Sequence, residues 1–425
     1  MLVFVINKNN QPLMPCTARK AKILLKQHRA KIIKRTPFTI KLFNGSSGYK
    51  QEITLGIDTG SKEVGFSATT PTKVLFENKL ILRTDIVKLL ATRREFRKTR
   101  RARKTRYRQP RFLNRKKADG WLAPSIENKI SAHLKSTALI YNILPIAKTI
   151  VEVANFDIQK INNPNIQGKE YQQGNQLNFW NVREYVLFRD KHKCKGKRGC
   201  TNKILNVHHI ETRKTGGNSP DNLITLCKDC HSDYHRGKLK LSLKRNATFR
   251  DATFMGIMRW AFYNKLKSLY PNVSLTFGYL TKNTRITNKL SKEHVIDARC
   301  ISGNPLAVPS LNNYLSKRVR TQNRQLHKAT INKGGTRKRN KSPKYVNGFQ
   351  LFDKVLYQNQ ECFIFGRRAT GSFDVRTLAG LKLSAGTPSK RLKLLEKANS
   401  TLIERKKTHF VSVLLKPESS VCNYF

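Results

Sequence analysis

Residues 52–81 read EITLGIDTGSKEVGFSATTPTKVLFENKLI, and they carry the clearest structural signal in the chain. The stretch contains three runs of apolar and β-branched residues, which are separated by short polar segments with a glycine or a proline. Such runs predict β-strands joined by turns, because β-branched and aromatic side chains fit a pleated, half-buried surface. The stretch therefore predicts a meander of β-hairpins, with one acidic residue, Asp58, at the end of the first strand.

Further helices and strands are expected on both sides of this meander. The spacing of apolar residues predicts helices over residues 17–30, 126–149, 250–270 and 291–301. Strands are expected over residues 3–6, 36–43, 149–158 and 273–281, and short strands return from residue 346 onward. Because a chain of 425 residues exceeds one ordinary hydrophobic core, the pattern predicts a multidomain α/β protein.

The chain is strongly basic. It contains 84 lysine and arginine residues against 26 aspartate and glutamate residues, which gives a formal net charge of +58. A charge of this size repels itself unless a polyanion covers it, so a nucleic-acid partner is indicated. We expect no membrane partner, because the sequence has no apolar run long enough to span a bilayer and its start resembles a short strand rather than a signal peptide.

The most basic segment lies at residues 93–117, where 14 of 25 residues are lysine or arginine. Good helix formers continue as far as Pro110, so the segment predicts a helix. Two interpretations stay open: a solvated or disordered arm, or a helix that lies along phosphate groups. The candidate nucleic-acid contacts are Arg93, Arg94, Arg97, Arg100, Arg101, Arg103, Arg106, Arg108 and Arg111.

Four of the eight cysteines fall close together, at Cys194, Cys200, Cys227 and Cys230. A disulfide framework is unexpected in a chain of this size without a secretion signal, so a metal site is the better interpretation. Four thiolates on two knuckles fit tetrahedral zinc, although the first spacing is wider than usual. A closed site of this kind is structural, because no coordination position stays open for water.

Four histidines lie within and after this cysteine cluster. His231 and His235 are spaced i, i+4, which places them on one helix face at a spacing that suits a metal ion. His208 and His209 are neighbours, so on a strand they point to opposite sides, and one can bind a metal while the other stays free as a base. The alternative is a purely structural zinc ribbon with incidental histidines.

Three acidic residues, Asp58, Glu152 and Asp297, lie far apart in the sequence. Taken alone, each is an ordinary turn residue or a partnered charge, and only the fold can bring them together. Gathered carboxylates repel one another unless a cation compensates. A cluster of the three therefore implies Mg²⁺ or Mn²⁺, as phosphodiester hydrolysis requires.

The segment from about residue 181 to 237 resembles the HNH, or ββα-metal, nucleases. By this resemblance, His209 is the general base, His208 is a ligand of the catalytic divalent ion, and His231 and His235 are further ligands. Asn222 matches the family asparagine that orients the His209 backbone or ring. A histidine suits the role of a base because its pKa lies near neutral.

The order of the acidic motifs resembles the split RuvC nuclease, which has an RNase H-like fold. By this resemblance, Asp58, Glu152 and Asp297 bind the metal, and His294 positions or activates the water. The HNH segment lies between the second and third motifs, and an arginine-rich bridge helix follows the first. The start Pro12-Leu13-Met14-Pro15-Cys16 and the later stretches at 323–328 and 366–371 resemble the IscB family.

The resemblance implies a division of the chain into seven parts. These are a PLMP domain (1–50), RuvC part I (51–90), the bridge helix (91–118), RuvC part II with a linker (119–175), the HNH domain (176–240), RuvC part III (241–312), and a basic segment with a β-rich C-terminal module (313–425).

The resemblance also implies a function. IscB proteins are RNA-guided endonucleases that bind a long guide, the omega RNA, and read a short motif beside the target DNA. The HNH site would cut the guide-paired strand and the RuvC site the displaced strand, with Mg²⁺ or Mn²⁺ at both sites and structural Zn²⁺. A monomeric protein in a cytoplasmic, prokaryotic ribonucleoprotein that joins the nucleoid on DNA is expected. The alternatives are an unguided nuclease of the same type and a non-catalytic nucleic-acid-binding transposon protein.

Overall fold

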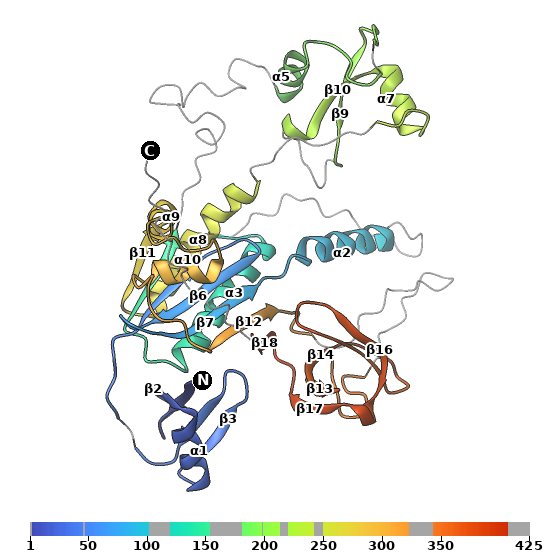
Figure 1. The fold of residues 1–425 in the computed structure, drawn as a ribbon. Helices are drawn as coiled ribbons and strands as arrows, with labels where there is room; N and C mark the ends of the chain where they lie inside the picture. Colours follow the sequence, from blue (N-terminus) through green and yellow to red (C-terminus); the bar gives the residue numbers. More distant parts are fainter. Residues whose placement is uncertain are drawn as a thin grey trace, which may run out of the picture. The chain divides into compact units, whose positions relative to one another are not determined.

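The computed structural model describes residues 2–45, 47–101, 120–153, 181–197, 199–212, 220–241, 250–322 and 343–406, with only the helix backbone at 96–101 and 250–254. The chain divides into two compact units. Unit 1 comprises Met1–Ala154 and Met258–Phe425, and unit 2 comprises Asn155–Ile257. Unit 1 is therefore built from two segments that are distant in the sequence (Figure 1). No helix of the described part has the length and apolar character that a membrane span requires.

A seven-stranded mixed sheet forms the centre of unit 1, in the order β11-β8-β5-β6-β7-β12-β18. Strands β5, β6 and β7 pair antiparallel as the predicted meander, while β8 runs parallel to β5 and β11 runs parallel to β8. The apolar side chains of Leu55, Ile57 and Phe66 are fully buried, which explains why these runs become central strands. The strands are Thr54–Asp58 (β5), Glu63–Thr69 (β6), Val74–Ile81 (β7), Lys148–Val153 (β8), Val273–Phe277 (β11), Asn313–Arg318 (β12) and Thr401–Arg405 (β18).

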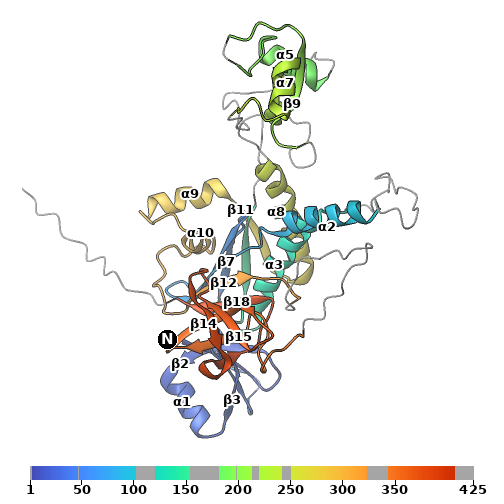
Figure 2. The same cartoon turned by 90° about the vertical axis from the view of Figure 1, so that its right-hand side faces the viewer.

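Helices lie on both faces of this sheet, with α9 and α10 on one side and α3 and α8 on the other (Figure 2). Helix α10 packs directly on β5 and β6 because two glycines leave room for its backbone. A Cβ atom at Gly56 would lie 1.9 Å from the Ala298 carbonyl oxygen, and one at Gly65 would lie 1.8 Å from that of His294. The helices are Ile86–Arg101 (α2), Pro124–Tyr141 (α3), Arg250–Leu269 (α8), Gly278–Thr287 (α9) and His294–Ile301 (α10).

Two smaller sheets occupy the ends of unit 1. The N-terminal sheet has the order β2-β1-β4-β3 and packs against helix α1 over the core residues Val3, Val5 and Ile40. The C-terminal sheet has the order β16-β15-β14-β13-β17 and buries Phe363 and Phe373. Their elements are Leu2–Ile6 (β1), Pro12–Thr17 (β2), Ala18–Lys26 (α1), Ala30–Lys34 (β3), Thr39–Leu42 (β4), Lys354–Tyr357 (β13), Gln360–Arg367 (β14), Ser372–Arg376 (β15), Lys382–Pro388 (β16), Ser389–Arg391 (η3) and Lys393–Glu396 (β17).

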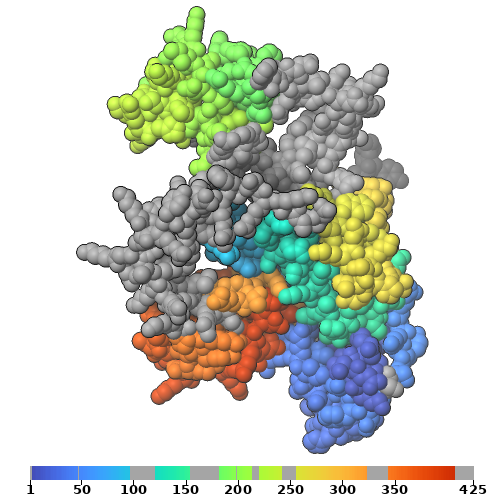
Figure 3. All heavy atoms as spheres, turned by 180° about the vertical axis from the view of Figure 1, so that it is seen from behind, coloured from blue at the N-terminus to red at the C-terminus, as the bar shows by residue number. Residues whose placement is uncertain are grey.

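Unit 2 is a small ββα arrangement, drawn in green in Figures 1 and 3. Its hairpin is held to α5 by Arg189, whose guanidinium donates to the carbonyl oxygens of Pro220 (2.7 Å) and Leu223 (2.9 Å). Beside it, the Asp190 carboxylate accepts the backbone N–H of Thr225 at 2.9 Å. The described elements are Val182–Arg189 (α5), Leu205–His209 (β9), Pro220–Asn222 (η2), Leu223–Cys227 (β10) and Lys228–His235 (α7).

The mixed α/β multidomain prediction is confirmed, and three predicted boundaries are wrong. The helix expected over 126–149 ends at Tyr141, because the chain turns there to enter β8. The strand expected over 273–281 ends at Phe277, where α9 begins instead. The helix expected over 17–30 ends at Lys26, and β3 follows it. Much of the arginine-rich segment (102–119), the polar stretch at 160–178 and the basic stretch at 323–342 lie outside the described residues.

Candidate functional sites

The fold brings Asp58 and Glu152 to one end of the central sheet. Asp58 is the last residue of β5, and Glu152 is the penultimate residue of the neighbouring parallel strand β8. The register pairs Ile57 with Val151, so the two acidic residues that follow stand beside each other on the face that α10 covers. Their exposures are only 6% and 8%, so both carboxylates lie in a poorly hydrated site.

Helix α10 adds His294 and Asp297 to this carboxylate site. The His294 Nδ1 atom lies 2.6 Å from Asp58 Oδ2, and its Nε2 atom lies 3.7 Å from Glu63 Oε2. The contact with Asp58 depends on the close packing of α10 at Gly65, which pairs with Asp58 in the sheet. All four residues predicted for this site therefore belong to one end of the sheet and the helix that covers it.

Two arginines that the sequence reasoning missed also belong to this site. Arg259 on α8 lies 3.3 Å from Glu152 Oε1 and donates twice to the carbonyl oxygen of Thr59, at 2.7 and 3.0 Å. Arg285 on α9 lies 2.9 Å from Asp297 Oδ1. The available signal was local: Arg259 interrupts the apolar run FMGIMRWAF of α8, and Arg285 lies on the helix just before the one that carries Asp297.

The electrostatics of the site are those of gathered acids. Burial, followed by the nearby Asp58 carboxylate, raises the pKa of Glu152, and the same two causes raise the pKa of Asp297. The hydrogen bond with Asp58 raises the pKa of His294. A cation placed among these groups would relieve the repulsion, so the donor set fits a divalent metal.

The geometry of Asp297 supports the same conclusion. Its Oδ1 atom is buried and makes no aligned hydrogen bond, although the Arg285 Nε atom is close. An acceptor of this kind suits an ion with oxygen ligands. The three acids are more widely spaced than the two clusters of unit 2 described next, since their ligand atoms do not all lie within 4.8 Å of one another.

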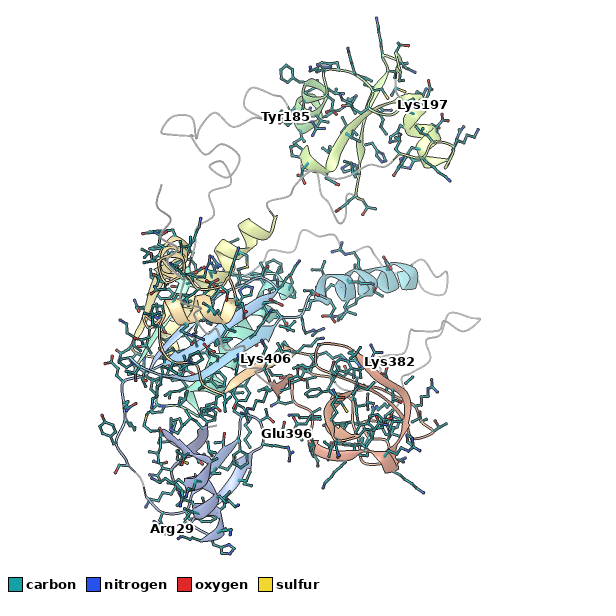
Figure 4. All side chains as sticks on the ribbon, viewed as in Figure 1. Arg29, Tyr185, Lys197, Lys382, Glu396 and Lys406 are labelled. Carbon is teal, nitrogen blue, oxygen red and sulfur yellow. The ribbon has the colours of Figure 1, made fainter. Side chains whose placement is uncertain are left out.

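The four predicted cysteines form one cluster in unit 2, with all ligand atoms within 4.8 Å of one another. The Cys194 sulfur accepts the backbone N–H groups of Gly196 (3.3 Å) and Cys227 (3.1 Å), as thiolates in knuckles do. A Cβ atom on Gly196 would lie 3.0 Å from the Cys230 sulfur, so glycine leaves room for the tight turn. Lys197 of this knuckle, labelled in Figure 4, is paired with Asp233 of α7 at 3.2 Å. The set fits tetrahedral zinc, and no disulfide forms among the described cysteines.

Three of the predicted histidines form a second cluster. The ring nitrogens of His208 on β9 and of His231 and His235 on α7 lie within 4.8 Å of one another. His208 is buried, its Nε2 atom has no hydrogen-bond partner, and burial lowers its pKa to about 4. A buried neutral imidazole with a bare nitrogen fits a metal ligand, so the set fits a divalent ion.

His209 and Asn222 lie beside this cluster. His209 follows His208 on β9, so its side chain projects from the opposite side of the strand, and it is more exposed. The Asn222 side chain accepts the N–H of Glu211 at 2.8 Å and donates to its carbonyl oxygen at 3.0 Å. Asn222 thus fixes the chain just after His209, and its effect on the His209 ring stays a prediction.

The structure describes only part of the arginine-rich segment. Arg93 and Arg94 are exposed on α2. The side chains of Arg97, Arg100 and Arg101 lie outside the described part, as do Arg103, Arg106, Arg108 and Arg111 entirely.

Comparisons with known proteins match two segments of the chain, and the second contains the cysteine and histidine clusters. Residues 3–174 match the family model described as RRXRR protein, and residues 192–237 match that described as HNH endonuclease. Anaredoxin of Nostoc sp. is 40% identical over 45 residues, which is 10% of this chain and 59% of that protein. Two solved structures of Streptococcus thermophilus Cas9, in complex with the GGAA PAM and the AGAA PAM, are 14% and 12% identical, each with a TM-score of 0.33. The matches cover 50% and 59% of this chain but 30% and 32% of the Cas9 chains, so the protein spans about a third of their length.

Proposed function

The chain resembles IscB-type nucleases in its RRXRR and HNH endonuclease segments, and from this premise we propose that it is an RNA-guided double-strand DNA endonuclease. The observation that carries the proposal is the presence of two separate clusters of potential metal ligands, one in each compact unit. One is the carboxylate site of unit 1, and the other is the histidine cluster of unit 2 beside His209. Two strands of one duplex need two cuts, and two independent sites meet that need.

In this proposal the carboxylate site is a split RuvC site that cuts the displaced strand. Asp58, Glu152 and Asp297 hold Mg²⁺ or Mn²⁺, and His294 positions or activates the attacking water. A bound ion would supply charge stabilisation for the phosphate and the departing oxygen. Support comes from the strand order, in which an antiparallel meander is extended by the parallel strands β8 and β11 beside a covering helix.

The histidine cluster would cut the strand that is paired with the guide. His208, His231 and His235 hold the divalent ion there, and His209 accepts the proton of the attacking water. Asn222 keeps the chain after His209 in place through its two hydrogen bonds with Glu211. The cysteine cluster holds structural zinc and fixes the start of α7, since Cys227 caps that helix.

The partners follow from charge and from the family resemblance. A net charge of +58 suits a protein that works inside a ribonucleoprotein, here with an omega RNA as guide. We assign the arginine-rich helix to RNA or DNA phosphates, the N-terminal sheet to the PLMP domain and the C-terminal sheet to reading of the target-adjacent motif. The seven-part division of the chain, a monomeric state and a location in the prokaryotic cytoplasm and nucleoid belong to the same proposal.

The first test is to express the protein with its flanking genomic RNA, purify it and sequence the RNA that remains bound. A discrete RNA, together with Mg²⁺-dependent cuts that match its variable end in a plasmid library, is the expected result. Cleavage at a fixed site without specific RNA would replace the proposal with an unguided nuclease. Bound RNA without cleavage under any divalent metal would replace it with a non-catalytic binding protein.

The division of labour has its own test. Asp58→Ala removes the partner of His294 and one ion ligand, so we expect a nickase that cuts only the guide-paired strand. His209→Ala removes the proposed base, so we expect a nickase that cuts only the displaced strand. Each strand carries its own label, and both rates are measured on one target. Loss of both cuts in either variant would contradict the model of two independent sites.

A further inference from the structure

Two aromatic side chains are exposed where β11 passes into α9. Phe277 is 36% exposed and Tyr279 is 62% exposed. Their rings are nearly parallel, with an angle of 13° and centroids 6.1 Å apart. Large exposed aromatic groups that line up in this way offer flat apolar faces to a ligand.

These rings stand at the rim of the carboxylate site. Gly278 lies between them, and a Cβ atom on it would come within 3.3 Å of Glu152 Oε1. Two turns further along the same helix, Arg285 contacts Asp297. One face of helix α9 therefore lies against the carboxylates. The aromatic pair lies at the N-terminal end of the helix and is exposed to solvent. Because both rings are exposed, the segment belongs to the surface of unit 1.

The charge around the pair favours a polyanion. Helix α9 reads GYLTKNTRIT and contains no acidic residue. Lys282 is exposed one turn from Tyr279, and Lys289 follows the helix, also exposed. A typical protein surface would offer few anions to these lysines, whereas a nucleic-acid strand offers one phosphate at each nucleotide.

We propose that Phe277 and Tyr279 form a stacking platform for bases of the displaced single DNA strand, next to the carboxylate site. The inference rests on the proposed function and deepens it by naming the residues that receive the strand. A duplex keeps its bases stacked inside, so only an unpaired strand can lay a base on these rings. Stacking suits this task because every base has a flat face, and a guided enzyme must accept any sequence.

The platform would also position the scissile phosphate. A base held on the rings fixes the sugar and phosphate that follow it in the strand. The carboxylate of Glu152 lies against Gly278, the residue between the two rings. Tyr279 and Phe277 are thus positioning residues, since they hold the strand and leave the chemistry to the acids.

The test uses the full complex with a target whose two strands carry different labels. Tyr279→Ala and the double variant with Phe277→Ala are expected to slow the cut of the displaced strand by roughly tenfold or more, which is what the loss of one stacked base implies. The guide-paired strand, cut in unit 2, serves as the internal control and keeps its rate. Tyr279→Trp preserves a flat ring and is expected to restore the rate, while Ile286→Ala, at an apolar site 56% exposed on the same helix, leaves it unchanged.

A second readout follows the base itself. The fluorescent base 2-aminopurine is placed at successive positions of the displaced strand, in complexes that also carry Asp58→Ala so that the strand stays intact. Quenching at one or two positions, lost in Tyr279→Ala, is the expected result. Equal quenching and equal rates in all variants would overturn the platform. In a parallel complex the guide RNA carries 2-aminopurine instead, and quenching found only there would also overturn it. If the wild-type complex cuts neither strand, the proposed function itself fails, and the fluorescence still decides whether the rings bind the strand.

Discussion

Arg259 and Arg285 both face acids of the carboxylate site, yet their surroundings differ. Arg259 is fixed by two hydrogen bonds to the Thr59 carbonyl oxygen in addition to its contact with Glu152. For Arg285, the close partner is Asp297, and the nearest atoms, Arg285 Nε and Asp297 Oδ1, are not aligned as a hydrogen bond. An ion that uses Asp297 as a ligand must therefore compete with the Arg285 guanidinium for the same carboxylate.

Replacing Arg285 tests this competition. Arg285→Ala is expected to lower the Mg²⁺ concentration for half-maximal cutting of the displaced strand by roughly fivefold, because the competing cation is gone. The measurement is a metal titration of both cuts, with direct binding of Mn²⁺ followed in parallel. Lys267→Ala removes an exposed positive charge from helix α8 and is the matched control. An unchanged or higher Mg²⁺ requirement would refute the competition.

His133 gives a prediction on pH and stability. It is fully buried on α3, its Nδ1 atom lies 2.8 Å from the Lys129 carbonyl oxygen, and its Nε2 atom has no partner. Burial lowers its pKa to about 4, from the ordinary value of 6.5. Because the folded state holds the histidine neutral, its contribution is complete above pH 6.5 and is lost as the pH falls toward 4. The loss is about 3 kcal/mol of the free energy of unfolding.

The measurement is urea unfolding of unit 1 at several pH values between 8 and 4. His133→Gln cannot titrate, so its stability should fall less steeply between pH 6.5 and 4 than that of the wild type. Other acids titrate in both proteins, and the difference between the two curves isolates His133. Parallel curves would mean that this ring does not resist protonation.

Helix α10 illustrates how an element positions the site. It carries both His294 and Asp297, and its distance from the sheet is set by Gly56 and Gly65. Gly65→Ala would place a methyl group 1.8 Å from a backbone oxygen, so the helix must move away. Such overpacking costs about 1–3 kcal/mol and would separate His294 from Asp58.

The expected result for Gly65→Ala is a lower unfolding temperature of unit 1 and loss of the displaced-strand cut, with the other cut unchanged. Gly48→Ala is the control, because the nearest atom to its Cβ would be Leu13 Cδ2 at 3.9 Å, an ordinary contact. Retention of full displaced-strand cutting in Gly65→Ala would show that the close packing of α10 is unnecessary.

The sequence predicted these elements where local pattern is strong. The meander of β5, β6 and β7 and the helix around His294 were found because alternation and helical spacing are local signals. Helix α9 was missed because VSLTFGYLT alternates apolar with small or polar residues, as a strand does, whereas the pairing of β11 with β8 ends at Phe277. Arg259 and Arg285 were missed because their acidic partners, Glu152 and Asp297, lie on other elements, and only the fold brings them into contact.

At the scale of the whole molecule, the two units are held together in different ways. Unit 1 closes its sheet with strands from both ends of the chain, as when β12 pairs with β7 and β18 pairs with β12. Apart from the start of α8, the described part of unit 2 has only a two-stranded sheet, the short helices α5 and α7 and the turn η2, so its core is small. Domains of this size usually need a metal or a disulfide.

This difference predicts that the two units lose their structure separately. Cys227 is buried, caps α7 and belongs to the cysteine cluster. Cys227→Ser is expected to release the bound zinc and unfold unit 2, because a structural zinc supplies most of the folding free energy of a small domain. Unit 1 contains none of these ligands, so its melting transition and the displaced-strand cut should persist while the guide-paired cut disappears. Zinc content, calorimetry and strand-specific cutting measure the three effects, and Cys16→Ser, a half-buried cysteine outside the cluster, serves as the control. A variant that keeps one zinc per chain, or one in which both units melt together, would show that the cysteines are not an independent support for unit 2.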